Sequence, residues 1–376
     1  MGTVLLGPIL PTLSQQWHLP DELIGRLLFA KFIGAFVGGA TIPRKLRNGI
    51  LLGLLSSCAG FLGFAYAGGL VTGCIALFLA GFGLGQIIAS TDILIGRRYR
   101  HHTGSALSVI NFFWSLGAVC IGALVAALLP IYSLHSFLLT FAVLFVVVGF
   151  GTRLRTVFVD APAGSATESD DTPLPIARKV ILCFCVMLFF YGGLETCLSQ
   201  WITTYSDRYT HGHILGGQSA IVVLWSALTV GRLLSSLALR YVRESSLQRM
   251  AMLSSALLVL VVSRCHSATP LAIACALLGL SLSGFFPSTF ALLLRRRPPA
   301  RLAGLILAVS GLGAASLTWL MGLVSTHAGS LRVAMVVPFG AAIMLLAASF
   351  WLPPLEAGSA LFPRLPKLHD HAKASH

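Results

Sequence analysis

The chain has 376 residues, of which 56% are hydrophobic and only 10% are charged, and its formal net charge is +14. A soluble globular domain carries about a quarter charged residues, so this composition excludes a water-soluble protein. A positive charge of this size also occurs in nucleic-acid-binding proteins, so its distribution along the chain decides which partner it serves.

Apolar runs of about 20 residues predict membrane-spanning helices. Residues 1–13, MGTVLLGPILPTL, are apolar but too short to span, and no basic segment or small-residue cleavage site before or after them indicates a signal peptide. We interpret them as the second half of a helix whose start is missing, through truncation or a misassigned start. Eleven full-length runs follow, at 23–42, 50–68, 73–96, 104–128, 134–152, 179–205, 216–240, 247–265, 269–294, 302–325 and 332–352.

The basic residues collect in alternate loops. Of the 26 lysines and arginines, 20 fall in the loops or the C-terminal tail on one side of the predicted bilayer. By the positive-inside rule that side is cytoplasmic. We therefore expect a multi-pass protein of the plasma membrane, the bacterial inner membrane in particular, with both termini in the cytoplasm. The lipid bilayer, and no nucleic acid, accounts for the charge.

A repeat divides the spans into two sets. GFGLGQIIASTDILIGRR (81–98) aligns with GLSLSGFFPSTFALLLRR (279–296) at an offset of 198 residues, including polar and basic positions. A chance likeness among glycine-rich apolar helices is the alternative. The repeat predicts two like-oriented halves, typical of a secondary transporter. The predicted organisation is a six-helix bundle at 1–152, a cytoplasmic linker at 153–178, a second six-helix bundle at 179–352 and a cytoplasmic tail at 353–376.

One carboxylate stands out inside a span. On a helical wheel Glu195 shares an arc with Tyr191 and Ser199, whereas Trp201 faces away. A carboxylate in hydrocarbon costs roughly 2 to 4 kcal/mol, so Glu195 is expected to face protein or a water-filled cavity. It either binds a solute or a coupling proton, or it is protonated or ion-paired to hold helices together.

Other polar positions in the spans leave alternatives open. Asn111 lies in a stripe of small residues and can serve as an interhelical bond or as a solute ligand. Asp92 lies about 6 Å from the cytoplasmic end of its helix. It can pair with the basic loop that begins at Arg97, which the depth favours, or belong to a central site.

Two cations lie inside predicted spans. Counting 1.5 Å per residue places Arg232 about 12 Å and Glu195 about 24 Å from the same surface, which disfavours a direct pair. Lys31 lies about 12 Å below the opposite surface and Glu195 about 15 Å below it. We therefore expect a charge pair between Lys31 and Glu195 that breaks as the cavity opens.

Several motifs are discounted. GFGLG (81–85) resembles a dinucleotide fingerprint but lies within a span, so close helix packing is the better interpretation. The 8 cysteines have no paired spacing, and the tail histidines His369 and His371 lie in a segment typical of a solvated tail. No catalytic His–acid spacing occurs, so we expect no enzyme activity, no metal site and no cofactor.

Three segments carry a family resemblance: GSALSVINFFWSLGAVCIGAL (104–124), FFYGGLETCLSQWITTY (189–205) and the run at 304–332. They resemble the major facilitator superfamily, and within it the fucose, galactose and glucose proton-symporter branch. The resemblance implies that fold and the uptake of a monosaccharide driven by protons or sodium. It also places Asn111 and the Glu195 helix near the sugar, with Trp114, Trp201 and Trp319 as stacking platforms.

The sequence departs from this family pattern at two places. Where the branch often has a glutamate followed four residues later by an asparagine, this chain has Ile88 and Asp92, so the usual proton carrier is absent or moved. In the loop GGATIPRKLRNG (38–49), Arg44 is retained but Pro43 stands in place of the usual acid. We therefore expect the cytoplasmic gate to be held closed by other contacts than those usual in the family.

The sequence predicts a monomeric secondary transporter of a small polar solute, a monosaccharide, working by alternating access with a proton or sodium ion. The alternatives are an exporter of drug-like or anionic compounds, which Lys31 and Arg232 would suit, and a non-transporting membrane sensor derived from a transporter. The expected solute or coupling-ion residues are Glu195, Asn111, Lys31, Tyr191, Trp201, Ser199, Trp114 and Trp319. The expected gating residues are Asp92, Arg97, Arg44 and Arg232.

Overall fold

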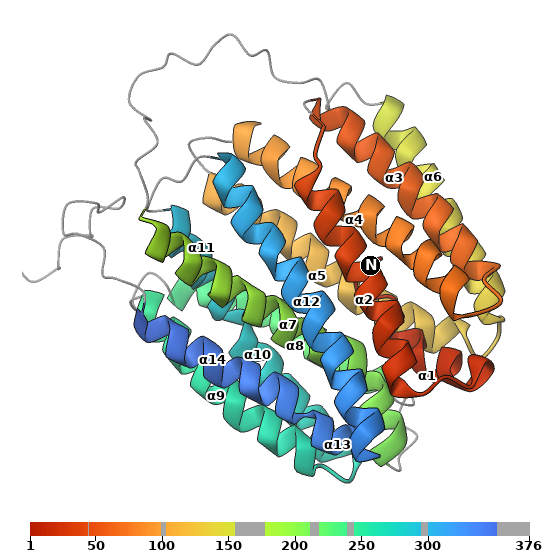
Figure 1. Cartoon of the computed structure of the whole chain (residues 1–376). Coiled ribbons are helices and arrows are strands. Elements are labelled where there is room, and N and C mark those ends of the chain that lie inside the picture. The colour runs from red at the N-terminus through yellow and green to blue at the C-terminus, as the bar shows by residue number, and fades with distance from the viewer. Residues whose placement is uncertain are drawn as a thin grey trace, which may run out of the picture.

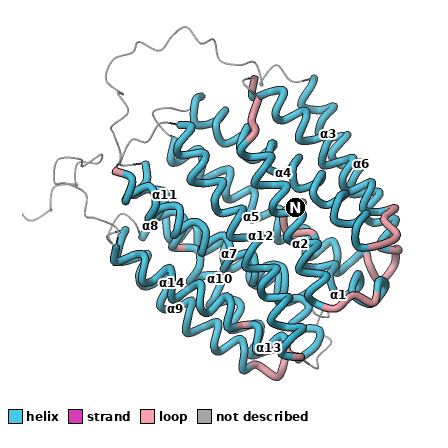
Figure 2. The backbone as a smooth tube through the Cα atoms, viewed as in Figure 1, coloured by secondary structure: helices cyan, strands magenta, loops and turns pink. Residues whose placement is uncertain are grey.

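The structure is a computed structural model that describes residues 1–43, 45–98, 103–154, 177–210, 218–238, 244–294 and 300–351. Throughout these ranges the regular structure is helical, as Figure 2 shows. Most of the predicted linker and the predicted tail lie outside the described residues.

The helices follow the apolar runs. The first half of the chain contains α1 (Leu6–Trp17), α2 (Asp21–Ala40), α3 (Leu46–Ala65), α4 (Leu70–Arg98), α5 (Thr103–Leu128) and α6 (Leu134–Leu154). The second half contains α7 (Arg178–Tyr209), α8 (Gln218–Ala238), α9 (Glu244–Arg264), α10 (Ala268–Ser283), α11 (Phe285–Leu294), α12 (Ala300–Ala328), α13 (Leu331–Ala334) and α14 (Val336–Trp351). Within the described residues, 9 helices are long and apolar enough to cross a membrane.

Three of the predicted spans differ in detail. The first is α1, which runs to Trp17 and ends at His18 in the left-handed conformation, so it extends further than the predicted segment 1–13. The run at 269–294 is divided at Gly284 into α10 and α11, and the run at 332–352 is divided at Met335 into α13 and α14. In both cases a short break leaves one span made of two helices.

The helices form two bundles whose largest contacts with each other are made by three helix pairs. In Figure 1, α3 and α6 lie on the outer flank of one bundle, and α9 and α14 lie on the outer flank of the other. Between them α2 packs against α12, α5 against α8 and α1 against α7. We call these three contacts the seam. The predicted fold, all-α with two six-helix bundles, is confirmed.

The sequence repeat corresponds to a repeat of contacts. A Cβ on Gly81 of α4 would lie 1.8 Å from the backbone oxygen of Lys31 on α2. The matching Gly279 of α10 would meet the backbone oxygen of Leu224 on α8 at 2.3 Å. Both glycines therefore allow a backbone to approach where any side chain would collide. The glycine motif at 81–85 is a packing motif, and its counterpart performs the same task in the second bundle.

A methyl group at these positions is expected to destabilise the protein. Changing Gly81 or Gly279 to alanine should lower the unfolding temperature in detergent, since overpacking of a close contact costs about 1–3 kcal/mol. Gly68→Ala is the matched control, because nothing lies within 4 Å of a Cβ there. Thermal unfolding monitored by tryptophan fluorescence measures the difference. Equal stability of the Gly81 and Gly68 variants would contradict the close approach.

Candidate functional site

A buried ion pair lies at the seam between the bundles. Arg232 of α8 places Nη2 3.4 Å from Oε1 of Glu195 on α7, and both side chains are about nine-tenths buried. The guanidinium also crosses to the other bundle, where Nη1 donates to Oγ of Ser115 and to the backbone oxygen of Asn111 on α5. Arg232 therefore links α8 to a helix of its own bundle and to a helix of the opposite one.

This pair corrects two predictions. The direct contact of Arg232 with Glu195, which residue counting disfavoured, is present, and the predicted pair of Lys31 with Glu195 is wrong in this structure. The physical reason is the length of α7, whose 32 residues extend about 48 Å. A helix that exceeds a hydrocarbon core of about 30 Å must tilt or protrude, so distance along its axis is not depth.

Aromatic side chains border the pair. The ring of Trp114 on α5 lies 5.4 Å from Cζ of Arg232, a distance typical of a cation–π contact. Trp114 in turn meets Trp225 of α8 edge-on, with the ring centroids 5.0 Å apart. Tyr191, one turn before Glu195, stacks on Phe285 at 5.0 Å. The predicted residues Asn111, Tyr191, Trp114 and Arg232 are thus brought together around Glu195.

Lys31 occupies a separate polar position. Its Nζ donates to the backbone oxygen of Thr3 at 2.5 Å, and Nε2 of Gln200 on α7 donates to the same oxygen at 3.3 Å. The lysine also lies 4.9 Å from the centroid of the Phe32 ring. Among the described residues no carboxylate lies within ion-pair distance of Nζ. Lys31 is therefore a buried amine that donates to a backbone oxygen in the turn before α1.

Three other predicted residues have packing partners. Ser199 donates back to the Glu195 backbone oxygen at 2.7 Å, and the fully buried Trp201 donates from Nε1 to the Thr318 oxygen at 3.2 Å. Trp319 of α12 faces α2, where its ring meets Phe29 edge-on at 6.2 Å. None of these contacts is with the charged side-chain groups of Glu195 and Arg232.

Two of the remaining predicted gating residues, Asp92 and Arg97, belong to α4. Asp92 is partly buried near the end of α4. Arg97 belongs to the same helix, but its side chain lies outside the described residues, as does Arg44 altogether. The predicted pairing of Asp92 with its basic loop therefore stays a prediction.

A second ion pair, which the sequence did not indicate, joins the bundles at one end. Arg208 of α7 donates from Nη1 and Nη2 to both carboxylate oxygens of Asp21 on α2, at 2.7 and 2.6 Å. Ser325 of α12 donates to the same carboxylate at 2.6 Å, and the Glu22 backbone N–H donates to Oγ1 of Thr326 at 2.8 Å. We call the Asp21, Arg208 and Ser325 cluster the latch.

The spacing between α2 and α12 increases away from the latch. A Cβ on Gly322 would lie 2.4 Å from the Asp21 oxygen, and one on Gly25 would lie 3.1 Å from the Trp319 Cα. Further along, a Cβ on Gly311 would lie 3.6 Å from the Cα of Phe36, which is ordinary contact. The two helices therefore fit most tightly at the latch end, and the bundles are closed there.

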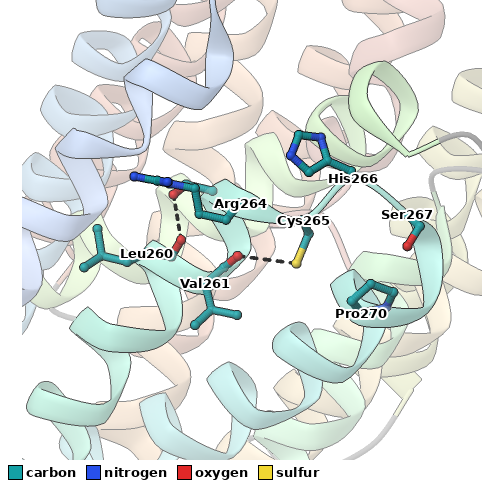
Figure 3. Close-up of a pocket in the computed structure, with 8 residues that line it drawn as sticks. Leu260, Val261, Arg264, Cys265, His266, Ser267 and Pro270 are labelled. Carbon is teal, nitrogen blue, oxygen red and sulfur yellow. Dashed lines mark hydrogen bonds between the residues drawn. The ribbon is translucent and has the colours of Figure 1, made fainter.

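A surface hollow of about 650 Å³ lies elsewhere, between α9 and α10 (Figure 3). It is lined by Leu260, Val261, Arg264, His266 and Pro270 among others. Cys265 donates its thiol to the Val261 backbone oxygen. The hollow is lined by residues of α9, α10 and the turn between them, and none of the seam residues described above is among them.

The family model of the Major Facilitator Superfamily matches residues 1–301. The chain belongs to this superfamily. The superfamily is one of transporters, and the 9 described helices that are long and apolar enough to span a bilayer make this chain a multi-pass membrane protein. The family resemblance inferred from the sequence is confirmed at this level.

The curated relatives of this major facilitator protein cover part of it. A 4-hydroxybenzoate transporter, PcaK of Pseudomonas putida, is 31% identical over 151 residues, which are 38% of this chain and 34% of that protein. The PcaK of Pseudomonas aeruginosa is 30% identical over 146 residues, 37% of this chain and 32% of that protein. The matched part of the chain thus spans about a third of the length of these relatives.

Solved structures match over almost the whole chain. The fucose:proton symporter FucP of E. coli has a TM-score of 0.63 at 17% identity and covers 94% of this chain and 95% of its own. The xylose transporter XylE of E. coli, in a partially occluded inward open conformation, has a TM-score of 0.76 at 12% identity, covering 96% and 95%. At such identities the likeness concerns the fold.

Proposed function

We propose that the protein is a secondary transporter that moves a small polar organic solute by alternating access, with its binding site at the Glu195–Arg232 pair. The observation that supports this is the position of the pair: it is buried, and it joins α7 and α8 of one bundle to α5 of the other. A solute that replaces one of these contacts changes the relative free energies of the two arrangements of the bundles. A ligand that binds one arrangement more tightly shifts the equilibrium toward it.

Coupling to a proton is part of the proposal. Glu195 is the acid at this point of the seam, and its negative charge is offset by Arg232. When a solute occupies the guanidinium, Glu195 loses that partner, and an isolated charge in a buried site is costly unless a proton neutralises it. Sodium is the competing coupling ion. The proposed location is the plasma membrane, with both termini in the cytoplasm, as the charge of the loops predicts.

Two solute classes have support of different kinds. The sequence resemblance favours a monosaccharide, for which Asn111 and the Trp114 ring would supply a polar contact and a stacking surface. The curated relatives are named for 4-hydroxybenzoate, an aromatic acid, and the positive charges of Arg232 and Lys31 suit an anion. The monosaccharide is the prediction from sequence, and the aromatic acid is the candidate that the charges at the seam favour.

Counterflow in proteoliposomes tests the proposal. Vesicles that contain the full chain and are loaded with unlabelled solute are expected to take up labelled solute transiently, because an alternating-access carrier exchanges faster than it equilibrates. Fucose, galactose and glucose are assayed beside 4-hydroxybenzoate, with protein-free vesicles as the control. Binding of a solute without any exchange would overturn the transport proposal in favour of a sensor, and export of anions from loaded cells would reverse its direction.

A further inference from the structure

One edge of the Arg232 guanidinium, formed by Nε and Nη2, has fewer hydrogen-bond acceptors than it has donors. An arginine carries five N–H donors arranged as a planar fork. Nη1 donates across the seam to Ser115 and Asn111, whereas Nη2 contacts Oε1 of Glu195 at 3.4 Å. Nε is buried and has no hydrogen-bond partner among the described residues. The side chain that carries these donors is nine-tenths buried.

In Arg208, by contrast, two guanidinium nitrogens both bind one carboxylate. Arg208 places two nitrogens 2.6 and 2.7 Å from the two oxygens of Asp21. A charge-assisted bond between an arginine and a carboxylate measures about 2.7–2.9 Å. Glu195 lies beyond that distance and touches one nitrogen of Arg232, so the Nε and Nη2 edge lacks the bidentate partner that its geometry fits.

The surroundings of this edge restrict what can fill it. Trp114 lies 5.4 Å from the guanidinium carbon and is itself set edge-on against Trp225. These rings form a wall between α5 and α8, at the seam. A ligand bound there meets two parallel N–H donors beside a flat apolar surface.

We propose that the Nε and Nη2 edge of Arg232 is a carboxylate site and that the solute is a small monocarboxylate with a flat, unsaturated body. This rests on the proposed function, because it assigns the solute class at the same pair. The carboxylate accepts two N–H bonds from the edge, and the planar body lies against Trp114. Glu195 gives up its contact with Nη2, so Arg232 exchanges an internal carboxylate for that of the solute.

Specificity follows from this exchange. A neutral isostere such as an amide presents an N–H donor where the edge requires an acceptor, and it leaves the Arg232 charge without a counter-charge. Buried polar groups that stay unpaired make such discrimination strong. A monosaccharide offers hydroxyl acceptors but no negative charge to replace Glu195. The site is therefore expected to reject both.

The test uses the full chain in proteoliposomes, with labelled 4-hydroxybenzoate as the probe. Unlabelled benzoate is expected to inhibit counterflow, and benzamide, its uncharged isostere, is expected to be at least about tenfold weaker. Arg232→Lys keeps the charge but removes the fork, so it should weaken benzoate by at least about tenfold while the protein remains folded. Arg26→Gln is the matched control, since Arg26 is exposed and pairs with Glu22 at the surface.

Thermal stabilisation of the purified protein by benzoate gives a second readout that does not require transport. Stabilisation of the wild type and its loss in Arg232→Lys support the site even where no exchange is seen, and in that case the proposed function fails while the site stands. Exchange of a monosaccharide with no effect of benzoate on stability or counterflow overturns the carboxylate site but leaves the transporter. Equal affinity for benzoate and benzamide overturns the site as well.

Discussion

Replacing Glu195 by glutamine is expected to abolish accumulation of the solute while counterflow exchange continues. The glutamine keeps the shape and can contact Arg232, but it carries no charge and takes up no proton. A wild-type carrier that moves one proton with each solute supports about tenfold accumulation under a gradient of one pH unit, because that gradient is worth about 1.4 kcal/mol. The variant should only equilibrate the solute across the membrane.

The measurement is uptake into proteoliposomes with and without an imposed pH gradient, repeated with an imposed sodium gradient. Glu22→Gln is the control, because Glu22 carries the same charge but contacts Arg26 at the protein surface. Accumulation by Glu195→Gln at the wild-type level would rule out this carboxylate as the coupling group. A response to sodium alone would replace the proton as the coupling ion.

Breaking the latch is expected to open the bundles at the end where it lies. Asp21 is 6% exposed and Arg208 36% exposed, so the pair is worth less than a fully buried one. We expect Asp21→Asn to shift the equilibrium between closed and open forms by about 1–2 kcal/mol, roughly tenfold. The asparagine can still accept a hydrogen bond from the Ser325 hydroxyl, so we expect the variant to keep its fold.

Labelling of a cysteine behind the latch measures this shift. Trp319→Cys in a background without the 8 native cysteines is treated with a membrane-impermeant maleimide, in vesicles of both orientations. The labelling rate should rise about tenfold with Asp21→Asn, and only from the side predicted to be outside.

The charge-exchanged variant Asp21→Arg with Arg208→Asp provides the control for the pair itself. It should return the labelling toward the original rate, whereas each single reversal should leave position 319 open to the reagent. Unchanged labelling in Asp21→Asn, or equal labelling from both sides, would show that the latch does not hold the bundles closed.

The sequence was sufficient for the architecture and for the main polar position. The repeat that aligned Gly81 with Gly279 at an offset of 198 residues is matched by close contacts of the same kind, with Lys31 of α2 and with Leu224 of α8. The cost of a charge in hydrocarbon predicted that Glu195 faces protein, and it is buried beside Arg232. These predictions succeeded because they depend on periodicity and on transfer free energy, which are properties of the chain itself.

The partners of the charged groups could not be predicted in the same way. The choice between Lys31 and Arg232 for Glu195 depends on helix tilt and rotation, which packing against neighbours sets. The latch joins residues 187 positions apart. The sequence showed only that Asp21 and Arg208 lie at ends of predicted spans on the same side of the bilayer. The significance of the latch becomes visible only when α2, α7 and α12 are placed next to each other.

The glycine contacts within each bundle have a consequence for ion leakage. Where a backbone oxygen lies against a glycine, as at Gly81 and Gly279, no space remains for a file of water molecules between the helices. At these two points α2 is packed without a gap against α4, and α8 against α10. We therefore expect an uncoupled proton current to arise from variants of seam residues rather than from a path between these helix pairs.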